Sequence, residues 1–255
     1  MTAAEVQRLR DLLPTGLGSG EIRENIAADI LRRSVFSARM ESARYLARVR
    51  EACAQIAEGG INLARARELL LRELALMGHS PTDGGGIGNP ASVARLNLVV
   101  DTQRQMAASV ARLRCQTPAV LERWPAWELA RLVGKAVPRG DWPARWRNAG
   151  NAVRWEGALQ TAFMALKTSP IWQALGDGAG GFRDTLGNPY PPFAYSSGMA
   201  WVAVDRETCD RLGLTVPADQ EVEPPPLSPG EREIAEAANR LGFTPEDLAG
   251  GLEWA

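Results

Sequence analysis

The chain has 255 residues, a net charge of −1 and 45% hydrophobic residues. A chain of this length and composition forms one large domain or two small ones with a sizeable core, which excludes wholesale disorder. The near-neutral charge excludes nucleic-acid binding by bulk charge alone. Three cysteines, Cys53, Cys115 and Cys209, have neither a disulfide-framework nor a zinc spacing, which favours a reducing compartment.

Two stretches bear on membranes and secretion. The longest uncharged run, residues 185–204, is interrupted by prolines and glycines, so it does not predict a membrane span. The first residues, MTAAEVQRLRDLL, contain no apolar signal core. We therefore expect no membrane partner.

The first half of the chain has the pattern of helices. Residues 21–57 contain neither proline nor glycine, and their apolar residues recur at mostly helical intervals. This pattern predicts one long helix with Ser19 as its N-cap and Gly59 at its end, although a break within residues 34–42 is left open.

A second helix is expected over residues 63–77, capped by Asn62 and closed by Gly78. The short connection makes the two helices antiparallel. We therefore predict an N-terminal helical hairpin arm over residues 1–90. A glycine-rich loop ends this region, and Pro90 is expected to open a third helix.

After Pro118 the helical periodicity is lost, and short segments rich in proline and tryptophan follow. Residues 126–133 fit a strand or a short helix, and residues 200–204 are the best strand candidate. Asp141 and Asp205 are each expected to cap a short helix. The predicted fold is mainly α with a small α+β domain over residues 91–215 that has few short strands.

Charge is distributed unevenly along the chain. Residues 91–167 hold 12 basic and 5 acidic residues, a net of +7, whereas residues 177–255 hold 5 basic and 14 acidic, a net of −9. The sequence EVEPPP at residues 221–226 predicts an extended linker. Residues 216–255 are therefore expected to form a Pro-rich linker and an acidic helical tail.

No catalytic site or metal site is predicted. His79 is the single histidine and lies in a glycine-rich loop, so it is best explained as a solvated loop residue. The glycines at 84–88 follow no hydrophobic strand and precede no Lys-Ser/Thr pair, which excludes a P-loop or a Rossmann fingerprint. An enzyme with Glu128 and Asp141 as paired carboxylates is the least favoured alternative. We expect no cofactor.

Two segments are candidates for contact or for structure. Arginine and tryptophan alternate in the basic middle, which suits stacking on bases and binding to phosphates, although such tryptophans more often belong to a core. The uncharged run at 188–199 is expected to form a loop pinned to the core. The candidate contact residues are Arg123, Arg145, Trp146, Arg147 and Arg154, and the candidate structural loop residues are Tyr190, Pro191, Pro192, Phe193 and Tyr195.

The order of several segments resembles the phage head morphogenesis proteins, which include the Mu F-like minor head proteins. The segments are SVFSARMESARYLARVREACAQIAEGGINLARARELLLREL, ASVARLNLVVDTQRQMAASVARLR, AWELARLVGKAVPRGDWPARW, MALKTSPIWQALGDG and LGNPYPPFAYSSGMAWVAVDRETC. The resemblance covers about residues 34–213, and residues 142–205 are its most specific part. Many members end the Pro-Pro loop with a histidine and a cysteine pair. This chain has FAYSSGM there, so no metal or redox role carries over.

The resemblance implies a non-enzymatic minor head or virion assembly protein of a phage or prophage. It implies phage portal or capsid proteins as partners and a part in head morphogenesis or genome packaging. It also implies location in the bacterial cytoplasm during assembly, a place in the phage head, and an oligomer there. The alternative is a nucleic-acid-contacting protein that uses the basic Trp/Arg-rich middle on DNA.

Overall fold

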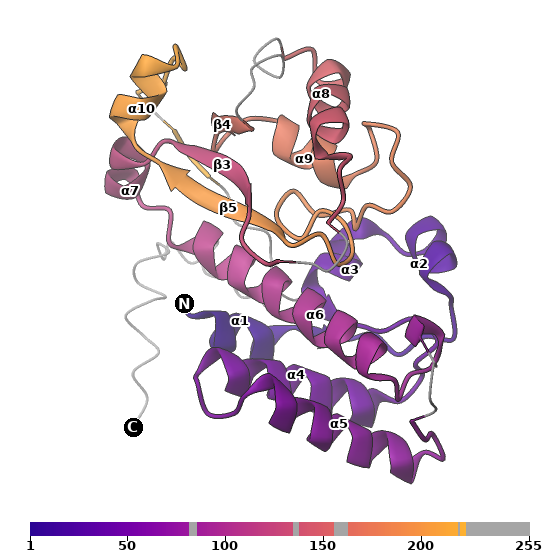
Figure 1. Ribbon diagram of the computed structural model, residues 1–255. Helices are drawn as coiled ribbons and strands as arrows, with labels where there is room; N and C mark the ends of the chain where they lie inside the picture. The colour runs from indigo at the N-terminus through magenta and orange to yellow at the C-terminus, as the bar shows by residue number, and fades with distance from the viewer. Residues whose placement is uncertain (82–85, 135–137, 156–162, 219, 223–255) are drawn as a thin grey trace, which may run out of the picture.

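The computed structural model describes residues 1–81, 86–134, 138–155, 163–218 and 220–222. These residues form a mixed α+β fold that is mainly α, with ten α-helices and two small sheets among them (Figure 1). The predicted linker and tail fall almost entirely outside the described residues.

The elements up to the first hairpin are α1 (Ala3–Leu9), β1 (Asp11–Leu12), α2 (Ser19–Asn25), α3 (Ala28–Arg33), β2 (Ser34–Val35), α4 (Ala43–Ala57) and α5 (Leu63–Leu76). Those that follow are η1 (Gly86–Gly88), α6 (Val93–Arg114), α7 (Pro118–Arg123), β3 (Ala126–Arg131), α8 (Trp142–Ala152), β4 (Met164–Leu166), α9 (Ile171–Gly176), β5 (Met199–Val204) and α10 (Arg206–Arg211).

A continuous helix over residues 21–57 is not formed, and the break that the sequence left open within residues 34–42 is present. The chain turns extended at Ile26 and again at Ser34, where β2 pairs in parallel with β1. A new helix, α4, begins after Ser42, whose side chain accepts a hydrogen bond from the Tyr45 N–H. The prediction of Ser19 as an N-cap is wrong, because Ser19 is the first residue of α2 and Gly18 is its N-cap.

A buried arginine fixes this extended stretch. Arg10 is almost completely buried, and its guanidinium donates to the backbone oxygen of Ser34 and, at 2.6 Å, to Oε1 of Gln103. Burial lowers the pKa of Arg10 to about 10. The guanidinium thus joins the end of α1 to β2 and α6 at once.

The hairpin of α4 and α5 is packed into the body of the molecule. Asn62 caps α5 as predicted, since its side chain accepts from the Arg65 N–H at 2.9 Å. Tyr45 of α4 and Leu70 of α5 belong to one apolar cluster with Leu96 of α6. The hairpin therefore covers α6 and does not project as a free arm.

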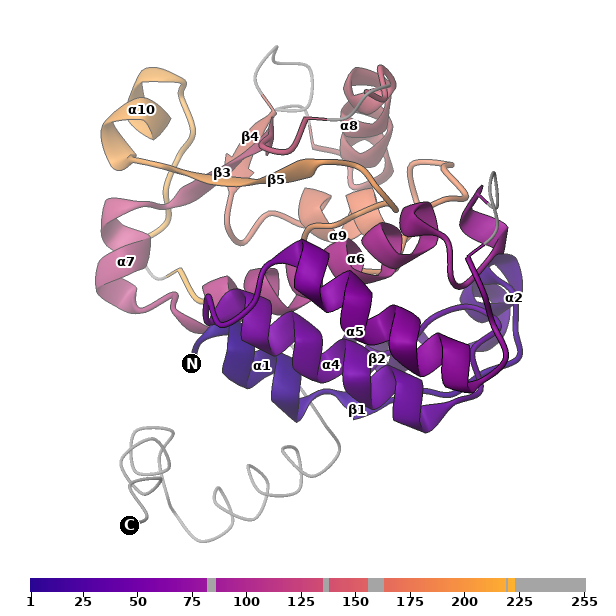
Figure 2. The ribbon, with the colours of Figure 1, turned by 60° about the horizontal axis from the view of Figure 1, so that its bottom comes forward.

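Helix α6 lies between the α1–α4–α5 layer and the sheet of the other half (Figures 1 and 2). It begins at Val93 and not at Pro90, because Ser92 is the residue whose side chain accepts from the Arg95 N–H. Val6 of α1 packs in the same cluster as Met106 of α6 and Trp127 of β3. Packing thus crosses the boundary expected at residue 90.

The larger sheet has the order β4-β3-β5 and is antiparallel throughout. Side chains alternate along β3: Trp127 and Leu129 face the cluster that includes α6, whereas Ala126 faces the cluster around Cys209 of α10. The segment that fitted a strand or a helix is therefore a strand, and the strand predicted at 200–204 is confirmed.

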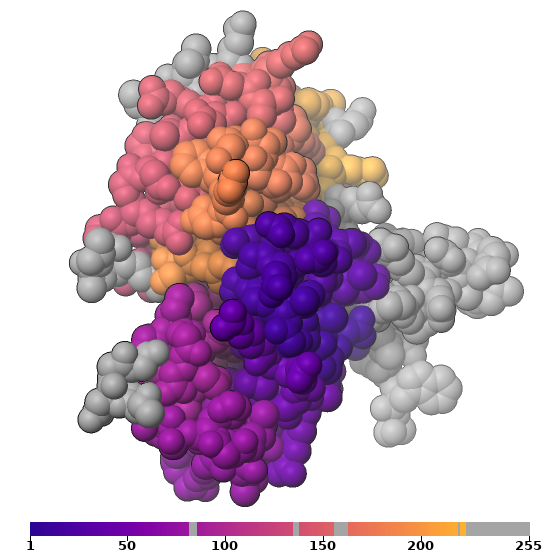
Figure 3. Space-filling view, turned by 90° about the vertical axis from the view of Figure 1, so that its right-hand side faces the viewer, coloured from indigo at the N-terminus to yellow at the C-terminus, as the bar shows by residue number. Residues whose placement is uncertain are grey.

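The segment between α9 and β5 lies against the α2–α3 region, as the space-filling view shows where orange meets indigo (Figure 3). Arg32 donates through Nε to the Gly187 oxygen at 2.9 Å. A Cβ on Gly176 would lie 1.7 Å from the Asn188 oxygen, so only glycine permits this approach. These contacts hold the N-terminal end of the segment NPYPP, residues 188–192, against the body.

Candidate functional site

The tryptophans of the basic middle form the interior of the α+β half. Trp146 is completely buried, and its ring centroid lies 5.8 Å from that of Trp155 and 5.5 Å from that of Trp172. Trp172 in turn packs edge-on against Trp201 of β5. The prediction that Trp146 contacts nucleic acid or a partner is therefore wrong, because the side chain is used in the core.

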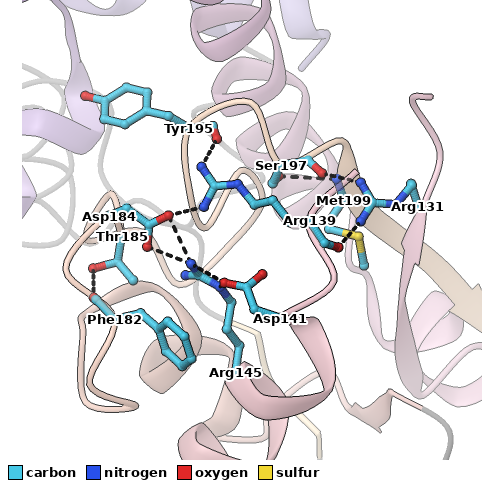
Figure 4. Close-up of polar contacts among 10 residues, drawn as sticks. All are labelled: Arg131, Arg139, Asp141, Arg145, Phe182, Asp184, Thr185, Tyr195, Ser197 and Met199. Atoms are coloured by element: carbon cyan, nitrogen blue, oxygen red, sulfur yellow. Dashed lines mark hydrogen bonds and ion pairs between the residues drawn. The ribbon is translucent and has the colours of Figure 1, made fainter. Parts of the chain in front are cut away.

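Arg145 is also withdrawn from any contact surface, since only 5% of its side chain is exposed. Its guanidinium lies 4.2 Å from the centroid of the Phe182 ring. Its Nε donates to Asp141 at 2.8 Å, and Nη2 donates to both carboxylate oxygens of Asp184 (Figure 4). The prediction of Arg145 as a contact residue is thus wrong, because its hydrogen bonds are made inside the protein.

Two further arginines extend this network, and we call Arg131, Arg139 and Arg145 the arginine clamp. Arg139 donates to the Asp184 carboxylate and, at 2.8 Å, to the Tyr195 oxygen. Arg131 donates at 2.9 Å to the Ser197 oxygen and at 2.9 Å to the Arg139 oxygen (Figure 4). The clamp joins β3 and α8 to the segment before the loop at 188–199 and to the C-terminal part of that loop.

Asp184 is the acidic centre of the clamp. Burial on its own raises the pKa of this carboxyl, but hydrogen bonds from Arg139 and Arg145 outweigh burial, and the net pKa is lowered. The carboxylate is therefore held ionised by two cations. Such an arrangement is suited to fixing a loop and leaves the carboxylate poorly placed to accept a proton from a substrate.

The loop residues singled out from the sequence lie mostly inside the protein. Tyr190 and Phe193 are completely buried, Pro191 and Pro192 are buried, and Tyr195 is partly exposed. Phe193 stacks at 6.2 Å on Trp172, which places it in the same aromatic interior as Trp146. The Pro191–Pro192 peptide bond is cis.

The remaining candidate arginines are exposed but are not brought together. Arg123 ends α7 and stacks on Trp124 at 5.6 Å, whereas Arg147 lies on α8 and Arg154 directly follows it. Helices α7 and α8 lie on opposite sides of the sheet region in both ribbon views (Figures 1 and 2). One continuous surface through all the predicted contact residues is therefore not formed.

The minor catalytic candidates do not assemble either. Asp141 bonds to Arg145 at the start of α8, and Glu128 lies in the middle of β3. Gly84 and Gly85 fall outside the described residues, and Gly86–Gly88 form the short helix η1. Within the described ranges, no group of three or more His, Cys, Asp or Glu residues is placed to hold a metal ion.

One pocket was missed by the sequence reasoning, and we call it the Lys167 pocket. It has a volume of about 440 Å³ and lies beside the sheet and the end of α6. Its lining includes Arg112, Gln116, Trp124, Trp127, Leu132, Lys167, Trp201 and Val202. The one available signal was compositional, because Lys167 is one of only two lysines among 29 basic residues.

Two cations meet the same aromatic ring in this pocket. The Lys167 ammonium lies 4.0 Å from the centroid of the Trp127 ring and donates to Oε1 of Gln116 at 2.5 Å. The Arg112 guanidinium lies 5.8 Å from the same centroid and donates to the Trp201 oxygen. Burial, followed by repulsion from Arg112, lowers the pKa of Lys167 to about 8.

The chain was compared with protein-family models, curated proteins and solved structures, and nothing in any of the three matches it. A search of the helices in the described part of the chain finds none with the length and apolar character needed to cross a bilayer.

Proposed function

We propose that this chain is a non-enzymatic structural protein of phage or prophage head assembly. It would be a minor head component that docks on portal or capsid proteins during head morphogenesis or genome packaging. The proposal draws on the resemblance over residues 34–213, and above all over residues 142–205. It places the chain in the bacterial cytoplasm during assembly and, as part of an oligomer, in the head.

The observation that carries the proposal is how residues 142–205 use their side chains. An active site keeps nucleophiles, acids or bases free in a cavity. Here Asp184 is engaged by Arg139 and Arg145, and the largest aromatic residues, such as Trp172 and Phe193, fill the interior. The most specific segments therefore serve packing, which is what an assembly component needs.

The outer face of the hairpin supports a docking role. The arginines there, among them Arg65 and Arg72, are about half or more exposed and surround Glu68. Exposed ion pairs contribute little to folding, so such side chains are free to exchange partners. A surface of this kind steers a charged partner and fixes its register.

Co-expression with the portal and capsid proteins encoded by neighbouring genes tests the proposal. The tagged chain should co-purify with one of them, and charge reversal by Arg65→Glu with Arg72→Glu should reduce recovery at least tenfold. Arg147→Glu, on the distant helix α8, is the matched control and should leave recovery unchanged. If the wild-type chain recovers neither protein and does not sediment with procapsids, the proposal is wrong.

The same preparations address the DNA-binding alternative. Exposed Arg147 and Arg154 and the net charge of the basic middle favour phosphate contact. Phosphate contacts predict an affinity that falls steeply as salt rises, because bound counterions are released. DNA binding with that salt dependence, lost in Arg147→Glu but kept in the hairpin variant, would favour the alternative.

A further inference from the structure

We propose that the Lys167 pocket binds a small organic carboxylate that carries an apolar or aromatic body. The proposal is independent of head assembly. It stands on the two cations at the pocket, on its rigid aromatic wall and on its apolar rim.

The two cations lack an opposite charge. Among the described residues, no carboxylate forms an ion pair or hydrogen bond with Lys167 or Arg112. Lys167 donates to the Gln116 side chain and Arg112 donates to the Trp201 backbone oxygen. Lys167 is only 6% exposed, and its ammonium group has three N–H donors. Gln116 accepts from just one of them. A buried cation without an opposite charge is costly, so an anion in the pocket would be stabilised by both groups.

The wall of the pocket is held in place by stacking. Trp127 lies parallel to Trp201, with ring centroids 5.2 Å apart and an angle of 2° between the planes. The two residues come from the neighbouring strands β3 and β5, whose ladder fixes their spacing. Since both rings are buried and the Lys167 ammonium lies over Trp127, the stack holds this cation in a fixed position, and little freedom is lost when a ligand binds to it.

The rim explains why a bare anion is not the best ligand. Leu132 is 57% exposed and Val202 is 37% exposed, and both line the pocket. An apolar body of the ligand would cover them and gain about 25 cal/mol per Å² of buried apolar surface. The volume of about 440 Å³ falls within the range of about 300–1,000 Å³ that is usual for small-molecule sites.

The charge available fits a single carboxylate better than a phosphate. Arg112 presents a planar set of donors that matches a carboxylate, and Lys167 supplies one further charge. A phosphate usually has several backbone N–H groups around it at a helix N-terminus or a glycine-rich turn. The lining residues come from β3, β5, the neighbourhood of β4, the C-terminal part of α6 and the α7 region, and they do not build such a nest.

Titration with paired acids and amides tests the proposal. The probes are butyrate, octanoate, 3-phenylpropionate and indole-3-acetate, each beside its neutral amide, with calorimetry for the indole and tryptophan fluorescence for the others. At least one acid should bind saturably, and its amide should bind at least tenfold more weakly. Inorganic phosphate should compete poorly with that acid.

Variants locate the binding in the pocket. Lys167→Met and Arg112→Met should each weaken binding of the acid about tenfold or more, since each removes a charged hydrogen-bond donor. Arg147→Met is the control and should bind as the wild type does. Affinity should fall as the pH rises through about 8 in the wild type and at a higher pH in Arg112→Met, which lacks the repulsion from Arg112, but not in Lys167→Met.

Three results would overturn the proposal. The first is an absence of charge-dependent binding across the whole panel. The second is equal affinity of wild type and Arg112→Met, a variant of an exposed side chain that is expected to fold even if Lys167→Met does not. The third is phosphate binding with which none of the acids competes.

Discussion

Arg145 reaches Asp184 across 39 positions of sequence, and its Nη2 lies 2.8 and 3.0 Å from the two carboxylate oxygens. This contact is the centre of the arginine clamp. Replacing Asp184 by Asn keeps the shape and removes the charge, so we expect the free energy of unfolding to fall by about 1.5–3 kcal/mol. Urea unfolding measures the change, and a double-mutant cycle with Arg145→Met isolates the coupling between the two residues.

The same pair predicts a sensitivity to acid. The pKa of Asp184 is lower in the folded chain, so its contribution to stability is present above the pKa of the unfolded carboxyl and is lost as the pH falls through the folded pKa. The wild type should therefore lose more stability on acidification below about pH 4 than Asp184→Asn does. Parallel acid curves for the two proteins would contradict this.

Phe193 tests whether the loop at 188–199 is part of the core. The side chain is completely buried and packs on Trp172 and Trp201. Phe193→Ala should lower the free energy of unfolding by about 3–5 kcal/mol, because it leaves a cavity in a packed aromatic interior. Val202→Ala, at a partly exposed position of β5, should cost far less. A loop that acts as a linker would show fast amide exchange and no change in melting temperature in Phe193→Ala.

Because the pKa of Lys167 is lowered, we expect its contribution to the free energy of unfolding to rise with pH. Its pKa is about 8 in the folded chain against 10.5 for a free lysine. Between these values the unfolded chain binds a proton that the folded chain has lost, so the contribution of Lys167 rises by up to about 1.4 kcal/mol per pH unit. Below about pH 8 the buried charge opposes folding in full.

The measurement for Lys167 is a difference between two proteins. Tyr45, Cys53 and Tyr190 have pKa values raised by burial and lower the stability at alkaline pH, so the wild-type curve alone does not isolate Lys167. The free energy of unfolding of the wild type minus that of Lys167→Met should increase from pH 8 to 10.5. A constant difference would show that the folded pKa of Lys167 is normal.

The packing of the hairpin predicts the outcome of its deletion. Removing residues 43–77 would expose Leu96 and Val100 of α6, which pack against that hairpin. We expect the remaining chain to aggregate or to bind a dye that reports exposed apolar surface. A soluble, cooperatively folded remainder would instead support the free arm predicted from the sequence. Arg65→Ala, on the exposed face of α5, is the control and should change stability by less than about 0.5 kcal/mol.

Local signals in the sequence predicted local features well. Asn62 and Asp205 were expected to cap helices, and each does so through a hydrogen bond to a residue only three positions away. The strand at 200–204 was likewise predicted from the residues within it. Such features depend on residues that are neighbours in the sequence, so the local sequence pattern is enough to predict them.

Features set by distant residues were not predictable in this way. The break at Ile26 was not expected, and the break at Ser34, which the sequence only left open, lies where Arg10 contacts residue 34 and β2 pairs with β1. Within the candidate sites, Asp184 and Lys167 carried no motif, because their partners Arg145 and Gln116 lie 39 and 51 positions away. The division into domains at residue 90 stays a prediction, and the packing of α6 on both halves counts against it.

The contact between Arg10 and Gln103 spans 93 positions of sequence, which matters while the chain is being made. At about 5–20 residues per second, a ribosome needs on the order of 5–20 s to add the residues between them. During that time the first helix has left the ribosome without the α6 surface against which Val6 is buried. Helix α1 can therefore reach its buried position only after α6 has been made, and slower translation would prolong the exposure of its apolar face to chaperones.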